Sequence, residues 1–128
     1  MASWDDVRRI ANALPETSER SGDAVQWRVK DKLFAWERPL RQADLAELGE
    51  QASSDPPLAA RVPDLGAREA LLADAPDIYF ATAHFDGYPI VLVHLDRIGR
   101  DELEELLTEA WLARAPKRIV YAYLDGPD

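Results

Sequence analysis

Apolar residues recur along the chain at two kinds of spacing, and each predicts one kind of element. In residues 3–14 and 101–113 they recur every three or four positions, which is the repeat of an amphipathic helix. Residues 24–29 alternate between apolar and polar positions, and residues 33–38 form a second β-type run, so we expect an antiparallel hairpin. Residues 58–62 predict a further strand.

A second hairpin is predicted in residues 78–95, where two apolar runs flank Asp86-Gly87. Asp-Gly suits a two-residue type I′ turn, which needs positive φ at both positions. Such a turn would place His94 opposite Tyr79. The second run is apolar on both faces except at His94, which predicts a central strand with His94 packed beside aromatic rings.

The remaining segments carry weaker signals. Residues 16–23 read as a polar loop, and residues 40–57 as a loop with one or two helical turns at most, because Gly49 and a Ser-Ser-Asp-Pro-Pro run interrupt the pattern. Residues 65–74 predict a helix capped by Asp64. Its expected inward side chains are Ala67, Leu71 and Leu72.

The last segment, residues 119–124, fits either a helix after Pro116 or a strand, and we favour the helix. The resulting order is α-β-β-β-α-β-β-α-α. This order predicts an α+β fold, a two-layer sandwich with a mostly antiparallel five-stranded sheet and helices on one face.

Composition narrows the class of protein. A chain of 128 residues predicts a single domain spanning residues 1–128. The absence of cysteine excludes disulfides and thiolate chemistry. The first twenty residues show no signal peptide, and no apolar run reaches the roughly 18 residues of a membrane span, so we expect a soluble cytoplasmic protein without a membrane partner.

The sequence holds no common catalytic motif, which favours a non-enzymatic protein. The two histidines, His84 and His94, would lie about 17 Å apart along the predicted hairpin, too far to share a metal ion. We therefore predict no metal and no cofactor.

The net charge and the local distribution of charge lead to opposite expectations about nucleic-acid binding. The chain carries −9 at pH 7, which opposes generic binding to nucleic acid. Its basic residues nevertheless gather near residues 28–32, around Pro39 and around Pro116. If the hairpin tip and the last-helix junction meet in space, these residues could form a local basic patch.

Five motifs occur in a defined order: K-L-F-A-W-E-R-P at 32–39, T-A-H-F-D-G-Y-P at 82–89, V-L-V-H-L-D at 91–96, E-L-x-E-L-L-x-x-A-W at 102–111 and A-P-K-R at 115–118. Because these motifs occur in this order, the chain resembles the MmcQ/YjbR family over nearly its whole length. Ala83 stands where the family often has proline. The resemblance implies a frataxin-like (CyaY-like) fold. It also implies DNA binding, which the family is assigned through its "double wing" shape. Frataxin relatives bind iron through acidic residues of their first helix. Here that helix offers only Asp5 and Asp6, so we do not expect iron binding.

The resemblance also implies site residues at the motif positions: Trp36, Arg38, Thr82, His84, Tyr88, Lys117 and Arg118. We expect Trp111, which is also a motif position, to be a core residue. Two hypotheses follow. The first is a non-enzymatic binding domain with DNA as its partner. The second is a small-ligand or protein-interaction domain with a pocket near the Asp86-Gly87 turn.

Overall fold

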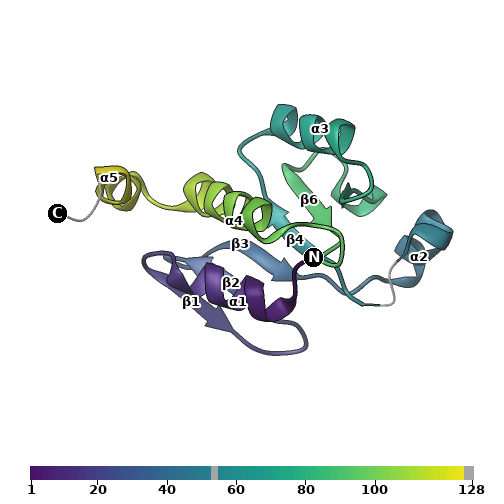
Figure 1. Cartoon of the computed structure of the whole chain (residues 1–128), viewed down its shortest axis with the longest axis horizontal. Coiled ribbons are helices and arrows are strands. Elements are labelled where there is room, and N and C mark those ends of the chain that lie inside the picture. Colours follow the sequence, from purple (N-terminus) through teal and green to yellow (C-terminus); the bar gives the residue numbers. More distant parts are fainter. Residues whose placement is uncertain (53–54, 126–128) are drawn as a thin grey trace.

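The computed structural model describes residues 1–52 and 55–125, and within them it has an α+β fold. In this part of the chain, six strands form one sheet in the order β1-β2-β3-β4-β6-β5, with every neighbouring pair antiparallel (Figure 1). The strands are β1 (Thr17–Arg20), β2 (Gln26–Val29), β3 (Lys32–Glu37), β4 (Leu58–Arg61), β5 (Tyr79–Phe80) and β6 (Ile90–Val93). The helices are α1 (Trp4–Ala13), α2 (Gln42–Leu48), α3 (Leu65–Asp74), α4 (Arg100–Arg114) and α5 (Lys117–Asp125), with 3₁₀ turns η1 (Gly49–Gln51) and η2 (Ala83–Phe85).

The predicted five-stranded sheet is wrong by one strand. The additional strand is β1, which lies within the segment predicted as a polar loop. Its sequence, Thr-Ser-Glu-Arg, has no apolar residue, and its side chains alternate between half-buried and exposed. A sheet edge tolerates this pattern because the strand is held by its pairing with β2 and by polar contacts of Glu19 with Arg8 and Asn12 of α1, not by apolar burial.

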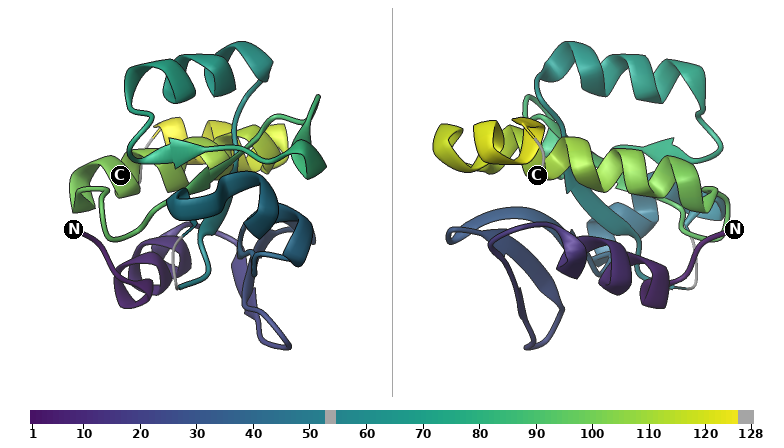
Figure 2. Two further views of the ribbon diagram at one scale, coloured as in Figure 1. Left: turned by 90° about the vertical axis from the view of Figure 1, so that its right-hand side faces the viewer. Right: turned by 60° about the vertical axis from the view of Figure 1, so that its left-hand side comes forward.

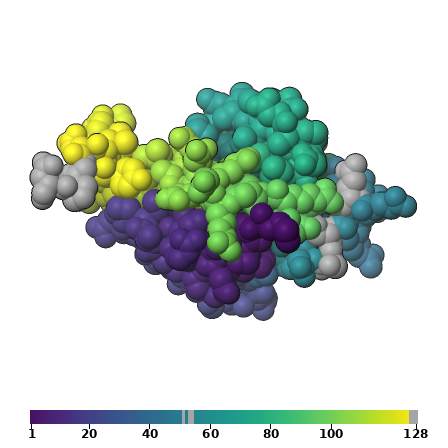
Figure 3. Space-filling model, in the orientation of Figure 1, coloured from purple at the N-terminus to yellow at the C-terminus, as the bar shows by residue number. Residues whose placement is uncertain are grey.

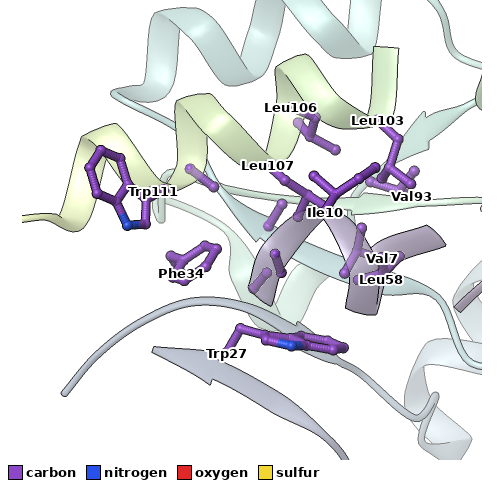
Figure 4. Packing of buried hydrophobic residues seen from close by; sticks show 14 of the residues in the cluster. Val7, Ile10, Trp27, Phe34, Leu58, Val93, Leu103, Leu106, Leu107 and Trp111 are labelled. Carbon is purple, nitrogen blue, oxygen red and sulfur yellow. The ribbon is translucent and has the colours of Figure 1, made fainter. Parts of the chain in front are cut away.

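Helices α1 and α4 cover one face of the sheet, which we call the first face, and the main core lies beneath them (Figure 4). Val7 and Ile10 of α1 and Leu107 of α4 meet the buried Trp27 and Phe34 of the sheet there. Both predicted helical stripes are therefore confirmed. Trp111 is buried as expected, and its Nε1 donates a hydrogen bond to the Pro15 carbonyl at 2.9 Å.

Helix α3 has the predicted bounds but a different buried residue. Its apolar residues Ala67, Leu71 and Leu72 are only half-buried, whereas Arg68 is buried. The Arg68 Nε donates to the Ile90 carbonyl at 3.1 Å. Helical periodicity alone would predict an apolar residue at this buried position. The hydrogen bond allows the charged Arg68 side chain to be buried there instead.

The second hairpin forms with a different turn and register. Asp86 has φ −57° and Gly87 has φ +81°, and the Tyr88 N–H donates to the Phe85 carbonyl at 3.0 Å. These values describe a type II turn rather than type I′. Together with η2 it separates the strands, so that Tyr79 pairs with Val93 and Phe80 with Leu92. The predicted pairing of Tyr79 with His94 is wrong by one residue.

The last segment is the helix α5, as we favoured. It extends beyond the end of α4 at one end of the molecule, whereas α2 lies at the other end (Figure 1). Ile119 is buried and the Tyr123 ring lies 5.0 Å from that of Trp111, and these contacts hold α5 to the core. Among the helices of the described part, none is both long and apolar enough to cross a membrane.

Candidate functional site

The face of the sheet opposite α1 and α4, which we call the second face, has an aromatic centre. Trp36, Ala59, Leu92 and Phe80 are register partners across β3, β4, β6 and β5. Phe85 of η2 packs in the same cluster, and Leu48 of α2 packs against it. Helix α2 and turn η2 therefore cover part of this face, so the prediction that the helices lie on one face only is wrong. The Ala83 N–H joins η2 to α2 by donating to Glu47 Oε1 at 3.0 Å.

Buried polar side chains gather beside these rings. Five polar or charged side chains are buried in the described residues, and four belong to this region: Arg38, Asp44, Thr82 and His94. Burying a polar group costs free energy unless it finds a partner, so such a concentration marks either a structural network or a binding site.

Arg38 is held by three contacts. Its Nη2 lies 3.3 Å from Asp44 Oδ2, its Nη1 donates to the Pro39 carbonyl, and its guanidinium carbon lies 5.3 Å from the centre of the Phe85 ring. Asp44 Oδ2 also accepts from the Arg41 N–H at 2.9 Å. Arg38 thus fixes the start of α2 to the sheet, and its charge is already compensated.

His94 lies beside an aromatic ring, as predicted: its ring stacks on Phe80 with 4.3 Å between ring centres. Burial lowers the pKa of His94, and the positive charge of Arg97 lowers it further, against a smaller opposing effect of Asp96. His94 is therefore a neutral imidazole at pH 7. It also lines a cavity of about 390 Å³ next to the start of α1.

The family-implied residues Trp36 and His84 both contact Phe85 edge-on, at 6.4 Å and 4.8 Å between ring centres. Thr82 precedes η2, and its buried Oγ1 has no hydrogen-bond partner in the described part of the chain. Tyr88 is exposed three residues after Phe85. Phe85 organises this group, and the only signal for it in the sequence was its place inside the T-A-H-F-D-G-Y-P motif.

Lys117 and Arg118 do not join this group. They begin α5, at the end of the molecule opposite α2 (Figure 1). Arg114 ends α4 just before them, and Arg61 at the end of β4 lies close enough to Arg114 for its charge to act on it. We call Arg61, Arg114, Lys117 and Arg118 the basic end.

The basic end has positive charge without compensation. Burial lowers the pKa of Arg61, and the neighbouring charge of Arg114 lowers it further. None of its four residues forms an ion pair within residues 1–52 and 55–125. The Arg114 Nε is buried, and it too has no hydrogen-bond partner among these residues.

The first hairpin tip also reaches this region. Lys30 at the tip lies 3.5 Å from Glu16, and Glu16 and Arg118 line one cavity. The tip and the last-helix junction are therefore both close to Glu16, which brings these two basic segments into the same region. Arg28 keeps its charge, but three of its guanidinium N–H groups are already bonded to Gln26 and to the Asp31 carbonyl.

Metal binding has no visible support in the described residues. Within them, no group of three or more histidine, aspartate or glutamate side chains is placed to hold a metal ion.

Comparison with known proteins assigns this chain to a family. A family model named YjbR matches residues 12–113, so the chain belongs to the YjbR family, and the resemblance drawn from the motifs is confirmed. Two relatives, the uncharacterized protein Mb2600 of Mycobacterium bovis and the uncharacterized protein Rv2570 of Mycobacterium tuberculosis, are each 53% identical over 97% of both chains.

A solved structure shares the fold. It is the crystal structure of Deinococcus radiodurans protein DR2400, whose family-model domain is DUF419. The TM-score is 0.64 at 20% identity, covering 88% of this chain and 78% of that one. At this identity the likeness establishes the fold alone.

Proposed function

We propose that this protein is a non-enzymatic binding domain that holds the phosphate backbone of DNA at its basic end. One observation carries the proposal: the Arg114 Nε is buried without a hydrogen-bond partner in the described residues, and Arg61 lies close enough to feel the Arg114 charge, with no carboxylate paired to either. Two adjacent guanidinium groups repel each other unless an anion lies between them. Guanidinium groups bind phosphate with good geometry.

The start of α5 adds to this site. Lys117 and Arg118 are exposed in the first turn of a nine-residue helix. The first N–H groups of a helix have no partner within it and favour an anion. The negative net charge of −9 lies mostly elsewhere, so the attraction would be local.

The proposal assigns no phosphate contact to Arg38, because that side chain is buried and paired with Asp44. Trp36 and His84 lie against Phe85, in the turn η2 that is bonded to α2. Tyr88 lies near Arg61 through the pairing of β4 with β6, but it carries no positive charge to bind a phosphate. We therefore separate the family-implied residues into two groups, of which only Lys117 and Arg118 belong to the proposed DNA site.

Fluorescence anisotropy with a labelled DNA duplex at 50 and 200 mM salt tests the proposal. If three phosphates are contacted, affinity should fall about 40-fold between these salt concentrations. Replacing Arg114, Lys117 and Arg118 together by glutamine should abolish binding. The matched control replaces Arg9, Arg97 and Arg100 by glutamine, which removes the same number of positive charges elsewhere.

The control separates a site from a general effect of charge. Equal weakening in both triple variants would contradict a local site. Failure of the unaltered protein to bind at 50 mM salt would overturn the proposal.

The alternative, a domain that binds a small ligand or a protein, has one observation in its favour. It is the buried Thr82 Oγ1, which lacks a partner in the described residues beside the aromatic rings of the second face. A ligand that donates or accepts a hydrogen bond there would satisfy it. Chemical-shift changes confined to Thr82, His84 and Phe85 in a ligand screen would favour this function over DNA binding.

A further inference from the structure

A groove runs between α3 and α4 on the first face. Figure 1 and Figure 2 both show α3 lying beside α4, and the space between them has a volume of about 640 Å³. Apolar side chains supply much of its lining: Val62, Pro63, Ala67, Ala70, Leu71 and Leu106. An apolar groove of this kind accepts the apolar face of a helix.

One wall of the groove is negatively charged. Asp101, Glu102, Glu105 and Glu109 line it from α4, and none of the four is in an ion pair within the described chain. The Tyr79 hydroxyl donates to Glu102 Oε2 at 2.5 Å. Burial and the adjacent carboxylate raise the pKa of Tyr79, so the tyrosine stays protonated and keeps Glu102 oriented. The groove therefore fits an occupant that is apolar on one side and cationic beside it.

Helix α5 of the same chain has this composition. Lys117, Val120, Tyr121 and Leu124 follow the spacing i, i+3, i+4 and i+7, so they form one stripe along the helix. Tyr121 is 62% exposed and Leu124 is 64% exposed. The other side of α5 holds the helix to the core through Ile119 and Tyr123.

The two surfaces also agree in length and position. The acidic wall from Asp101 to Glu109 spans about 12 Å, and the stripe from Lys117 to Leu124 spans about 10 Å at the helical rise per residue. In the space-filling view, α5 stands at one end of the molecule, outside the groove between α3 and α4 (Figure 3). The stripe is thus open to a neighbouring molecule.

From these observations we infer that the chain associates head to tail, with the α5 stripe of one copy docked in the α3–α4 groove of a second copy. The two surfaces are different, so the contact is heterologous and each added copy offers a further free groove and a further free stripe. The interface is small, which makes the association weak and dependent on concentration. Lys117 beside the acidic wall makes it weaker at high salt.

Sedimentation velocity from about 10 to about 500 µM, the range in which small interfaces associate, measures this directly. The average molecular mass of the unaltered protein should rise above the monomer mass of 14.4 kDa as the concentration increases. Leu124→Asp on the stripe and Ala70→Arg in the groove should each weaken association at least about tenfold. Leu45→Asp alters a 44% exposed leucine on α2, outside both surfaces, and serves as the matched control.

Mixing the two defective variants gives the sharpest test. Leu124→Asp keeps an intact groove and Ala70→Arg keeps an intact stripe, so together they should form a one-to-one pair that grows no further. A mixture that stays monomeric, or an unaltered protein that is monomeric at every concentration, would overturn the inference. Lys117 belongs to both surfaces, but both substituted residues lie outside the basic end and no DNA is present, so this test can fail without the DNA proposal failing.

Discussion

The two faces of the sheet differ in how they are buried. The first face is covered by α1 and α4 and is filled by apolar side chains such as Trp27, Leu107 and Trp111. The second face has a smaller aromatic cluster, around which Arg38, Asp44, Thr82 and His94 are buried. The first face therefore depends mainly on apolar packing, whereas the second depends more on the pairing of specific polar groups.

The largest effect should come from the first face. Trp111→Ala removes a fully buried ring and its hydrogen bond to Pro15, and should lower the free energy of unfolding by about 4 kcal/mol. Chemical denaturation measures this change. Tyr121→Ala, at an exposed residue, is the control. A loss below about 1 kcal/mol at Trp111 would contradict the packing described here.

A somewhat smaller effect should follow from breaking the ion pair on the second face. Asp44→Ala leaves the buried Arg38 without its carboxylate and should cost about 3 kcal/mol. The double variant Arg38→Leu/Asp44→Leu removes both charges and should recover part of this loss, as measured by denaturation. If the double variant were no more stable than Asp44→Ala, an unpaired buried charge would not be the cause.

The smallest effect should be the pH dependence contributed by His94. Burial lowers its pKa in the folded protein below the ordinary value of 6.5, so the unfolded chain binds the proton more readily. The stability contributed by neutral His94 is then complete above pH 6.5 and is lost as the pH falls toward the lowered pKa of the folded protein. His94→Gln should remove this part of the pH dependence, whereas the exposed His84→Gln should leave it unchanged. The opposite sign would contradict a neutral buried imidazole.

Part of the site could be predicted because neighbours in sequence are neighbours in space. Lys117 and Arg118 follow Arg114 closely, so a cationic group around Pro116 was readable from the chain. Arg61 was not, because it joins them only through the pairing of β4 in the sheet. Phe85 was missed as an organiser for the same reason: Trp36 and Arg38 reach it from a strand far away in sequence.

By itself, the sequence determined the elements whose side chains repeat with a clear period: α1, α4 and most strands. Their apolar stripes can be buried in only one orientation. It also determined the family, because the ordered motifs are a property of the chain alone. Only the tertiary structure decided that β1 is a strand, that the turn at Asp86-Gly87 is type II and that Arg68 is buried in α3. For β1 and Arg68 the deciding interaction is a hydrogen bond to a partner that local periodicity does not encode. For the turn it is the 3₁₀ turn η2, which occupies residues that a two-residue hairpin would leave in the strand.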